Sequence, residues 1–230
     1  MTKRILPIIA LIFFAATAAA QIEQPRNILE VGVAGGLNMS QMDMQPKIGQ
    51  KYINGLNGGI SLRYTSEKYF KMICAAQIEA NFAQRGWEED FDDNTGNSYK
   101  RTLNYLEIPF LAHLAFGSEP RGLQFFINLG PQIGFLIDDS EEYIGHWSTD
   151  SRPVATQPVY GKSIDNKFEY GIAGGLGLEL KTKIGNFFIE GRYYYGLSDI
   201  FHNSKTDDFG RSANNTISAR LGYSIALFNK

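Results

Sequence analysis

Polar and apolar residues alternate one by one in the last part of the chain. Within residues 216–228, which read TISARLGYSIALF, every second position belongs to one apolar set. The members of this set are Ile217, Ala219, Leu221, Tyr223, Ile225 and Leu227. The positions between them are mostly small or polar. Because side chains on a β-strand point alternately to its two faces, the pattern predicts a strand with one face in lipid and the other in a polar lumen.

Seven further segments alternate in a similar way, which predicts eight strands in all. The predicted strands cover residues 28–38, 56–64, 72–86, 101–116, 123–138, 167–181, 186–197 and 215–228. The connections between them alternate in length. Short connections lie at 65–71, 117–122 and 182–186, and long ones at 39–55, 87–100, 139–166 and 198–214.

Short turns on one side and long loops on the other are typical of outer-membrane barrels. An even number of strands also closes such a meander without an exposed edge. We therefore expect an all-β fold, an eight-stranded antiparallel up-and-down transmembrane β-barrel with short periplasmic turns and long extracellular loops. Both termini of the barrel then lie on the periplasmic side.

The first twenty residues have the features of an export signal. They contain a basic start, an apolar stretch over 5–16 and a run of alanines that ends at Ala20. This predicts a Sec signal peptide over residues 1–20, cleaved near Ala20, and an outer-membrane barrel domain over 21–230. No later segment offers 18 consecutive apolar residues, so a mature chain embedded in a membrane has to cross it with strands.

Charge and cysteine usage narrow the classes of partner. Removing Lys3 and Arg4 from the 22 basic residues leaves 20 against 24 acidic residues, a formal charge of −4. This balance gives no reason to expect a nucleic-acid partner. The single cysteine, Cys74, excludes an intramolecular disulfide, and we assign it to packing on an apolar strand face.

The content of the polar face decides between a membrane barrel and a soluble one. All twelve lysines lie in the signal peptide, the termini, the loops or the strand ends. A sheet surface in water carries lysine freely, so we expect this polar face to be enclosed in a narrow lumen filled by side chains. Strand parity assigns ten charged residues to the lumen: Glu30, Arg63, Glu79, Arg85, Glu107, Glu169, Glu179, Glu190, Arg192 and Arg220. Isolated buried charges are costly, so the arginines should bridge carboxylates of neighbouring strands.

Aromatic residues suggest two further kinds of site. Trp and Tyr favour membrane interfaces, and five residues near strand ends are predicted interface aromatics: Trp87, Tyr105, Tyr170, Tyr195 and Phe228. The longest loop, 139–166, holds Tyr143, Trp147 and Tyr160. Aromatic residues often anchor contacts, so this loop is a candidate partner-binding loop, with a place in the lipid headgroup layer as the alternative.

Candidate chemistry is sparse. Five acidic residues close together form a weak candidate for a divalent cation, Glu88, Glu89, Asp90, Asp92 and Asp93. A solvated acidic loop is the simpler interpretation, and we predict no metal and no cofactor. His146 and His202 fall on two long loops beside several aspartates, which leaves a hydrolase site on the extracellular rim as an alternative. They form no recognised motif, so no catalytic residues are predicted.

Four segments together resemble a known family. Residues 30–37 (EVGVAGGL) and 169–176 (EYGIAGGL) share a pattern, and LNYLEIPFLAHLAF (103–116) and NLGPQIGFLID (128–138) complete the resemblance. The chain resembles the PorT-type outer-membrane β-barrel family of Bacteroidetes over nearly all of its mature length. The resemblance implies an eight-stranded barrel in the outer membrane of a Gram-negative bacterium. The family's namesake is linked to type IX secretion, and no catalytic residue can be carried over.

The prolines in the last two segments also predict a structural feature. Proline cannot donate a backbone hydrogen bond, so Pro109 and Pro131 predict a local bulge or break in the strand pairing.

We expect a non-enzymatic outer-membrane protein with a structural, interaction or accessory role in the cell envelope, one version being a place beside a secretion or uptake complex. Its expected partners are outer-membrane lipid, lipopolysaccharide and an envelope protein, with no nucleic acid. The first alternative is an outer-membrane hydrolase with an Asp/His site on the rim. The second is a soluble, lipocalin-like binder of an apolar ligand.

Overall fold

The computed structural model describes residues 24–229, except for 92–94, 120, 155 and 205–207. The predicted signal peptide and its cleavage site lie outside the described residues. Within the described part of the chain, no helix combines the length and the hydropathy needed to cross a membrane.

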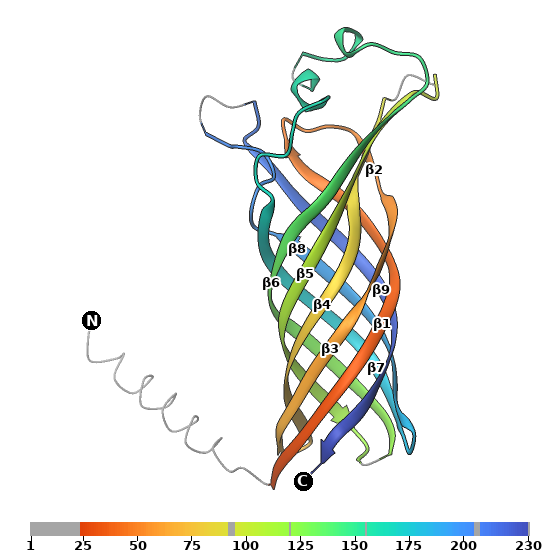
Figure 1. The fold of residues 1–230 in the computed structure, drawn as a ribbon, viewed down its shortest axis with the longest axis vertical. Coiled ribbons are helices and arrows are strands. Elements are labelled where there is room, and N and C mark those ends of the chain that lie inside the picture. The colour runs from red at the N-terminus through yellow and green to blue at the C-terminus, as the bar shows by residue number, and fades with distance from the viewer. Residues whose placement is uncertain (1–23, 92–94, 120, 155, 205–207, 230) are drawn as a thin grey trace, which may run out of the picture.

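The described residues form one antiparallel sheet that closes on itself. Its eight long strands are β1 (Gln24–Gln45), β3 (Ile53–Tyr69), β4 (Met72–Asp90), β5 (Ser98–Gly117), β6 (Gly122–Ile144), β7 (Phe168–Thr182), β8 (Gly185–Gly196) and β9 (Arg211–Asn229). The two-residue strand β2 (Gln50–Lys51) pairs with the upper end of β4. The spatial order is β4-β3-β1-β9-β8-β7-β6-β5, and β4 pairs with β5, which closes the ring (Figure 1). The predicted eight-stranded barrel is confirmed.

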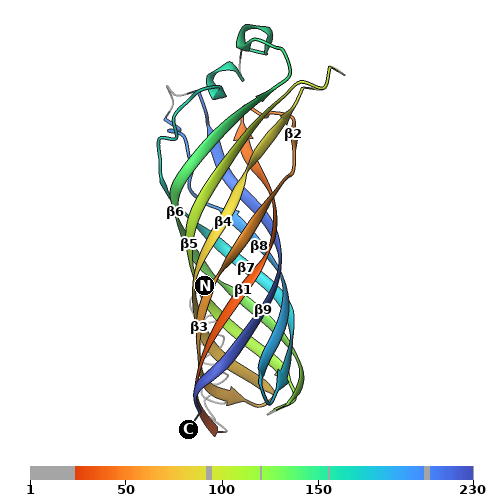
Figure 2. The same cartoon turned by 45° about the vertical axis from the view of Figure 1, so that its right-hand side comes forward.

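The connections also follow the predicted alternation. Short turns join β3 to β4, β5 to β6 and β7 to β8 at the end where β1 begins and β9 ends (Figures 1 and 2). The long connections lie at the other end, and the one between β6 and β7 contains the 3-10 helices η2 (Thr149–Ser151) and η3 (Gln157–Val159). By the convention of outer-membrane barrels, the short-turn end is called periplasmic below and the long-loop end extracellular.

Side chains along β1 separate cleanly between the two faces. Val33 and Leu37 point outward and are 56% and 59% exposed, whereas Glu30 and Asn38 are buried inside. The outward positions from Leu29 to Met39 are apolar or glycine. Ten residue steps of about 3.3 Å, on a strand tilted by about 40°, give an apolar band about 25 Å tall, which matches the apolar core of an outer membrane.

Several strands run further than the sequence predicts, at the extracellular end and, in β1 and β3, at the periplasmic end as well. β1 reaches Gln45 instead of residue 38, and β6 reaches Ile144 instead of residue 138. Beyond Met39 the inward positions of β1 become apolar, with Met42 and Met44 only 4% exposed, while the outward positions become polar. Side chains continue to alternate between the two faces of the strand, but the outer face becomes polar and the inner face becomes apolar. The extracellular end of a strand therefore lies beyond the last apolar residue of its outer face.

The prolines interrupt the pairing without shifting it. The β4–β5 ladder passes from Ile78–Phe110 directly to Asn81–Glu107 and skips Pro109, and the β5–β6 ladder skips the segment opposite Pro131. The register is the same on both sides of each gap. The predicted break is confirmed, and it follows from the missing N–H group of proline.

Candidate functional site in the lumen and at the extracellular end

The lumen at the level of the apolar band is lined by charge. The structure places the side chains of all ten parity-assigned residues inside the barrel, each 7% exposed or less. These residues are Glu30, Arg63, Glu79, Arg85, Glu107, Glu169, Glu179, Glu190, Arg192 and Arg220. They form three groups stacked along the barrel, and every arginine of the set contacts at least one carboxylate.

The group nearest the periplasm is centred on Arg63 of β3. Its Nη1 lies 2.6 Å from Oε2 of Glu179 and 3.5 Å from Oε2 of Glu30. The Nζ of Lys181 lies 3.7 Å from Glu30 and 3.6 Å from Glu179, which adds a second cation. His113 lies 3.3 Å from Arg63 through its Nε2. Two carboxylates thus face two cations, and β1, β3 and β7 are joined across the lumen.

The central group is centred on Glu79 of β4. Both terminal nitrogens of Arg192 donate to its carboxylate, at 2.9 and 2.8 Å, and Nη1 of Arg220 donates at 2.8 Å. Arg192 also lies 2.9 Å from Glu190. Asn81 donates to Oε2 of Glu79 at 2.8 Å. Two carboxylates and two guanidinium groups therefore neutralise one another, with their remaining hydrogen-bonding atoms largely used by amides, as a buried network requires.

The third group has more negative than positive charge. Arg85 of β4 forms ion pairs with Glu107 and, at 2.7 Å, with Glu169. The ring of Tyr194 lies 4.1 Å from the guanidinium carbon of Arg85, a cation–π contact. Asn214 donates a hydrogen bond to Oε2 of Glu169 at 2.7 Å, which satisfies part of the hydrogen-bonding capacity of this second carboxylate.

Glycine makes room for these charged groups. A Cβ atom at Gly175 of β7 would lie 2.5 Å from Oε1 of Glu190, and one at Gly134 of β6 would lie 2.8 Å from Cγ of Glu169. Both positions are buried and inward-facing. Within the repeated EYGIAGGL pattern, glycine is therefore required at position 175, because it leaves space for the carboxylate of Glu190.

Above the charges, the lumen is closed by an apolar cap. Its buried residues come from strand ends and from the long loops: Met42, Met44, Ile48, Trp87, Phe91, Tyr99, Leu103, Tyr105, Val159, Ile164, Ile200, Phe201 and Phe209. The rings of Phe201 and Phe209 stack with their centroids 4.9 Å apart. We call this set of residues the extracellular cap.

Two of the predicted interface aromatics belong to this cap, so their prediction is wrong. Trp87 and Tyr105 are completely buried and point into the barrel. Both share the parity of an assigned lumen residue on the same strand, Arg85 and Glu107 respectively. The alternation along the strand therefore indicates that both side chains point inward, whereas their nearness to a long loop suggested a place at the membrane interface. Tyr170, Tyr195 and Phe228 lie on the outer surface, 50%, 40% and 48% exposed.

Polar residues that the sequence analysis did not single out attach the loops to the cap. Arg101 lies 2.5 Å from Asp139 and 2.8 Å from Glu141, and its Nη1 donates to the carbonyl oxygen of Lys162 at 2.6 Å. These contacts join residues 38 to 61 positions apart in the chain, so no local pattern marks them.

A second attachment involves Glu89, which the sequence analysis placed in a solvated acidic loop. Glu89 is 2% exposed, and it accepts hydrogen bonds from Arg152 at 3.1 Å and from the hydroxyl of Tyr160 at 2.6 Å. Burial, together with this hydrogen bond to the carboxylate, raises the pKa of Tyr160 to about 12. The expectation of a solvated side chain is wrong for Glu89, because a loop residue more than sixty positions away covers it.

The three aromatic residues of the candidate partner-binding loop contact one another. The ring of Trp147 lies 5.5 Å from that of Tyr143 and 5.1 Å from that of Tyr160. Tyr99 of the cap supports the group, 5.3 Å from Tyr143 and 5.0 Å from Tyr160. Tyr143 remains 49% exposed. The loop therefore presents an aromatic group that rests on the cap.

The other candidate residues are dispersed. Asp92 and Asp93 lie outside the described residues, Glu88 is partly exposed in β4, and Asp90 forms an ion pair with Lys51 at 3.0 Å. In the part of the chain that the structure describes, no group of three or more His, Cys, Asp or Glu side chains is arranged to hold a metal ion.

The two loop histidines have different partners. The backbone N–H of His146 donates to Asn97, whereas that of His202 donates to Asp165 at 3.0 Å. The Nδ1 of His202 lies 3.6 Å from the same carboxylate, with the imidazole largely exposed. The structure does not bring the two histidines to a shared carboxylate, and this arrangement adds no support to the hydrolase alternative.

The chain is similar to the solved structure of Ail from Yersinia pestis, with 18% sequence identity and a TM-score of 0.37, over 86% of this chain and 99% of that one. OprG of Pseudomonas aeruginosa has 15% identity and a TM-score of 0.41, over 87% of this chain and 98% of that one. Neisserial surface protein A has 11% identity and a TM-score of 0.39, over 85% of this chain and 96% of that one. No functional argument follows from similarities at this level. No curated protein sequence matches the chain significantly.

One comparison shows the family directly. The profile described as "Outer membrane protein beta-barrel domain" matches residues 19–202, which is most of the chain. The match agrees with the closed ring of strands and with the apolar outer face. The chain belongs to the outer-membrane protein β-barrel domain family and is an outer-membrane β-barrel protein.

Proposed function

We propose that this protein is a closed, non-enzymatic barrel that holds an extracellular contact surface in the outer membrane, and that it acts as a structural or interaction protein of the envelope. The observation that carries the proposal is the filled interior, with three groups of ion pairs at membrane level and an apolar cap above them.

The filled interior argues against transport through the lumen. Arg192 and Arg220 reach from β8 and β9 to Glu79 on β4, so the central ion pairs cross the barrel from wall to wall. An eight-stranded barrel has an interior just wide enough for its own side chains. A solute that passed would have to separate buried ion pairs, which costs several kcal/mol for each pair.

The contact surface is proposed on the part of the sheet that stands above the membrane. β6 pairs with β7 only as far as Phe135, whereas its pairing with β5 continues to Ile144, and β4 follows β5 to Asp90. The ends of β4, β5 and β6, with the short β2 paired to β4, therefore form an extension of the sheet, visible at the top of Figures 1 and 2. Tyr143, which is exposed, and Trp147, which is partly buried against the cap, lie at its end, and aromatic residues are common anchors of protein contacts.

The more specific version of the proposal concerns the envelope partner. The sequence motifs that resemble the PorT-type family favour a bacterium of the Bacteroidetes and an accessory role beside a secretion or uptake complex. Lipid around the apolar band and lipopolysaccharide beside the upper strands are the expected surroundings of the same barrel.

Two measurements test the proposal together. Proteoliposomes that contain the purified barrel should not swell in small sugars, because the lumen is filled. In native envelopes, photo-crosslinking from the extension should give protein adducts that the variant Tyr143→Ser/Trp147→Ser loses. The matched control, Tyr170→Ser/Tyr195→Ser, changes aromatic residues on the outer wall and should retain the adducts. Rapid swelling, or adducts unchanged in the first variant, would contradict the proposal.

A further inference from the structure

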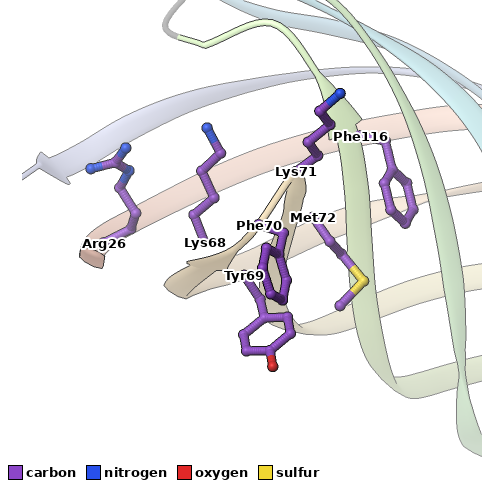
Figure 3. A pocket seen from close by; sticks show the side chains of 7 residues that line it. All are labelled: Arg26, Lys68, Tyr69, Phe70, Lys71, Met72 and Phe116. Carbon is purple, nitrogen blue, oxygen red and sulfur yellow. The ribbon is translucent and has the colours of Figure 1, made fainter. Parts of the chain in front are cut away.

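A pocket at the periplasmic end combines positive charge with an apolar surface. It has a volume of about 800 Å³ and lies around the β3–β4 hairpin, where β1 and β5 run alongside. Its lining residues are Arg26, Lys68, Tyr69, Phe70, Lys71, Met72 and Phe116 (Figure 3). None of them belongs to the lumen ion pairs described above, and the proposed function does not use them.

Two lysines of the β3–β4 hairpin, together with Arg26, bring positive charge to the pocket. Arg26 of β1 and Lys68 of β3 both lie near one carboxylate, that of Glu119, at 3.4 and 3.5 Å. These distances are long for ion pairs, and all three side chains keep partial contact with solvent. Lys71 in the turn is exposed. The long, shared contact of Lys68 and the exposed position of Lys71 leave an attraction for an anion that comes from outside the chain.

The apolar side of the pocket faces the surroundings of the barrel. Phe70 is 64% exposed and Phe116 is 39% exposed, and Met72 pairs with Phe116 across β4 and β5. In Figure 3 the amino and guanidinium groups extend to one side of the hairpin, while Tyr69, Phe70, Met72 and Phe116 extend to the other. The pocket is therefore amphiphilic, with a cationic part next to an apolar part.

The turn itself is strained in a way that keeps an aromatic ring outside. Tyr69 and Met72 pair directly, so Phe70 and Lys71 form a two-residue turn. Phe70 has a φ of 53°, in the left-handed region that favours glycine and is rare for a bulky residue. Its ring contacts Tyr69 edge to face, at 4.8 Å between centroids, and is otherwise largely exposed. Backbone strain at an exposed aromatic residue indicates that the ring contacts a molecule outside the chain.

The level of the pocket indicates what occupies it. It lies where the apolar outer face of the barrel gives way to the basic periplasmic end, the depth at which the phosphate groups of the periplasmic leaflet lie. We propose that this pocket binds an anionic phospholipid of that leaflet, with the phosphate near Arg26, Lys68 and Lys71 and an acyl chain along Met72 and Phe116. The cations match the phosphate, and the exposed side chains match the lipid tail.

Native mass spectrometry of the full barrel in detergent tests the site. Phosphatidylglycerol should be retained more strongly than phosphatidylcholine of the same chain length. The variant Lys68→Gln/Lys71→Gln should weaken phosphatidylglycerol retention by about tenfold or more, since each cation near a charged surface contributes about a fivefold effect. The control Lys47→Gln/Lys167→Gln removes the same charge from the extracellular end and should change nothing.

Three outcomes would overturn the site. They are equal retention of the two lipids, an equal loss in the control variant, and full displacement of phosphatidylglycerol by inorganic phosphate, which would indicate a site for a free anion.

A second variant separates lipid contact from stability. Phe70→Gly relieves the strained φ and removes the ring, so it should leave the unfolding midpoint unchanged or raised while weakening the retention of both lipids. A variant that unfolds more easily and retains lipid as the parent does would show that the ring serves folding only.

Discussion

The central group of lumen charges shows why single residues matter in this barrel. Glu79 is held by Arg192 and Arg220 together, and the group is balanced, with two carboxylates and two guanidinium groups. Removal of one member leaves a charge inside a narrow interior with too few partners. Breaking a buried pair from one side typically costs about 3–5 kcal/mol, far more than a surface pair contributes.

The variant Arg220→Leu tests this at one position. Glu79 keeps Arg192 in the variant, so we expect the unfolding free energy in detergent to fall by about 3 kcal/mol, the lower end of the range. Urea unfolding followed by the β-signal in circular dichroism measures the change. Lys167→Leu alters an exposed loop lysine and should stay within about 0.5 kcal/mol of the parent. Similar losses in the two variants would contradict the balanced network.

Tyr160 makes a prediction about alkaline pH. Its pKa of about 12 lies above the value of about 10 for a tyrosine in an unfolded chain, so the neutral hydroxyl stabilises the fold. That contribution is complete below about pH 10 and is lost as the pH rises through about 12. The difference between the tyrosinate absorbance titrations of the parent and of Tyr160→Phe should show one step near pH 12. A step for Tyr160 near pH 10 would mean that the hydroxyl does not donate to Glu89.

At the scale of whole strands, the distinctive feature is a change of solvent along one continuous element. β1 faces lipid with Val33 and Leu37, and then faces water with Gln41 on the same side. Inside, Glu30 and Asn38 give way to Met42. The strand keeps its alternation throughout. The lower part is therefore built as a membrane barrel, and the upper part as a soluble barrel with an apolar core.

Two lysine substitutions on the same face of β1 test this change. Val33→Lys places a charge near the middle of the apolar band, where it should destabilise the inserted barrel by about 2–4 kcal/mol. Gln41→Lys places the same charge above the band and should cost less than about 1 kcal/mol. Refolding into liposomes, measured by the heat-dependent gel shift, compares the two. Equal effects would mean that the band does not end near Met39.

The sequence predicted some features of the strands well and others poorly, for physical reasons. Parity placed all ten charged residues in the lumen, because the period of two holds along a whole strand regardless of solvent. The extracellular ends of the strands were predicted too short, because the faces exchange polarity above Met39 although the alternation continues. The contacts of Glu89 with Arg152 and Tyr160 were not predicted, since they depend on how a loop folds back over the barrel.

For the whole molecule, the apolar outer face, the charged interior and the extracellular cap give one consistent arrangement. The membrane level is closed by ion pairs, the extracellular level is closed by apolar packing, and the periplasmic rim is basic. The lipocalin-like alternative requires an apolar interior at the level of the apolar band, where Arg63, Glu79 and Arg192 are buried instead. A membrane barrel with a filled lumen accounts for both faces.

The most direct test of this arrangement is the side-chain environment along β9 in a lipid bilayer. Spin labels on single cysteines, in a Cys74→Ser background, report collisions with oxygen, which dissolves preferentially in lipid. Labels at Ile217 and Leu221, now 47% and 65% exposed, should collide frequently, whereas labels at Thr216 and Ser224, both 2% exposed, should not. The opposite alternation, with frequent collisions at Thr216 and Ser224, would contradict the assignment of an apolar outer face and an enclosed charged lumen.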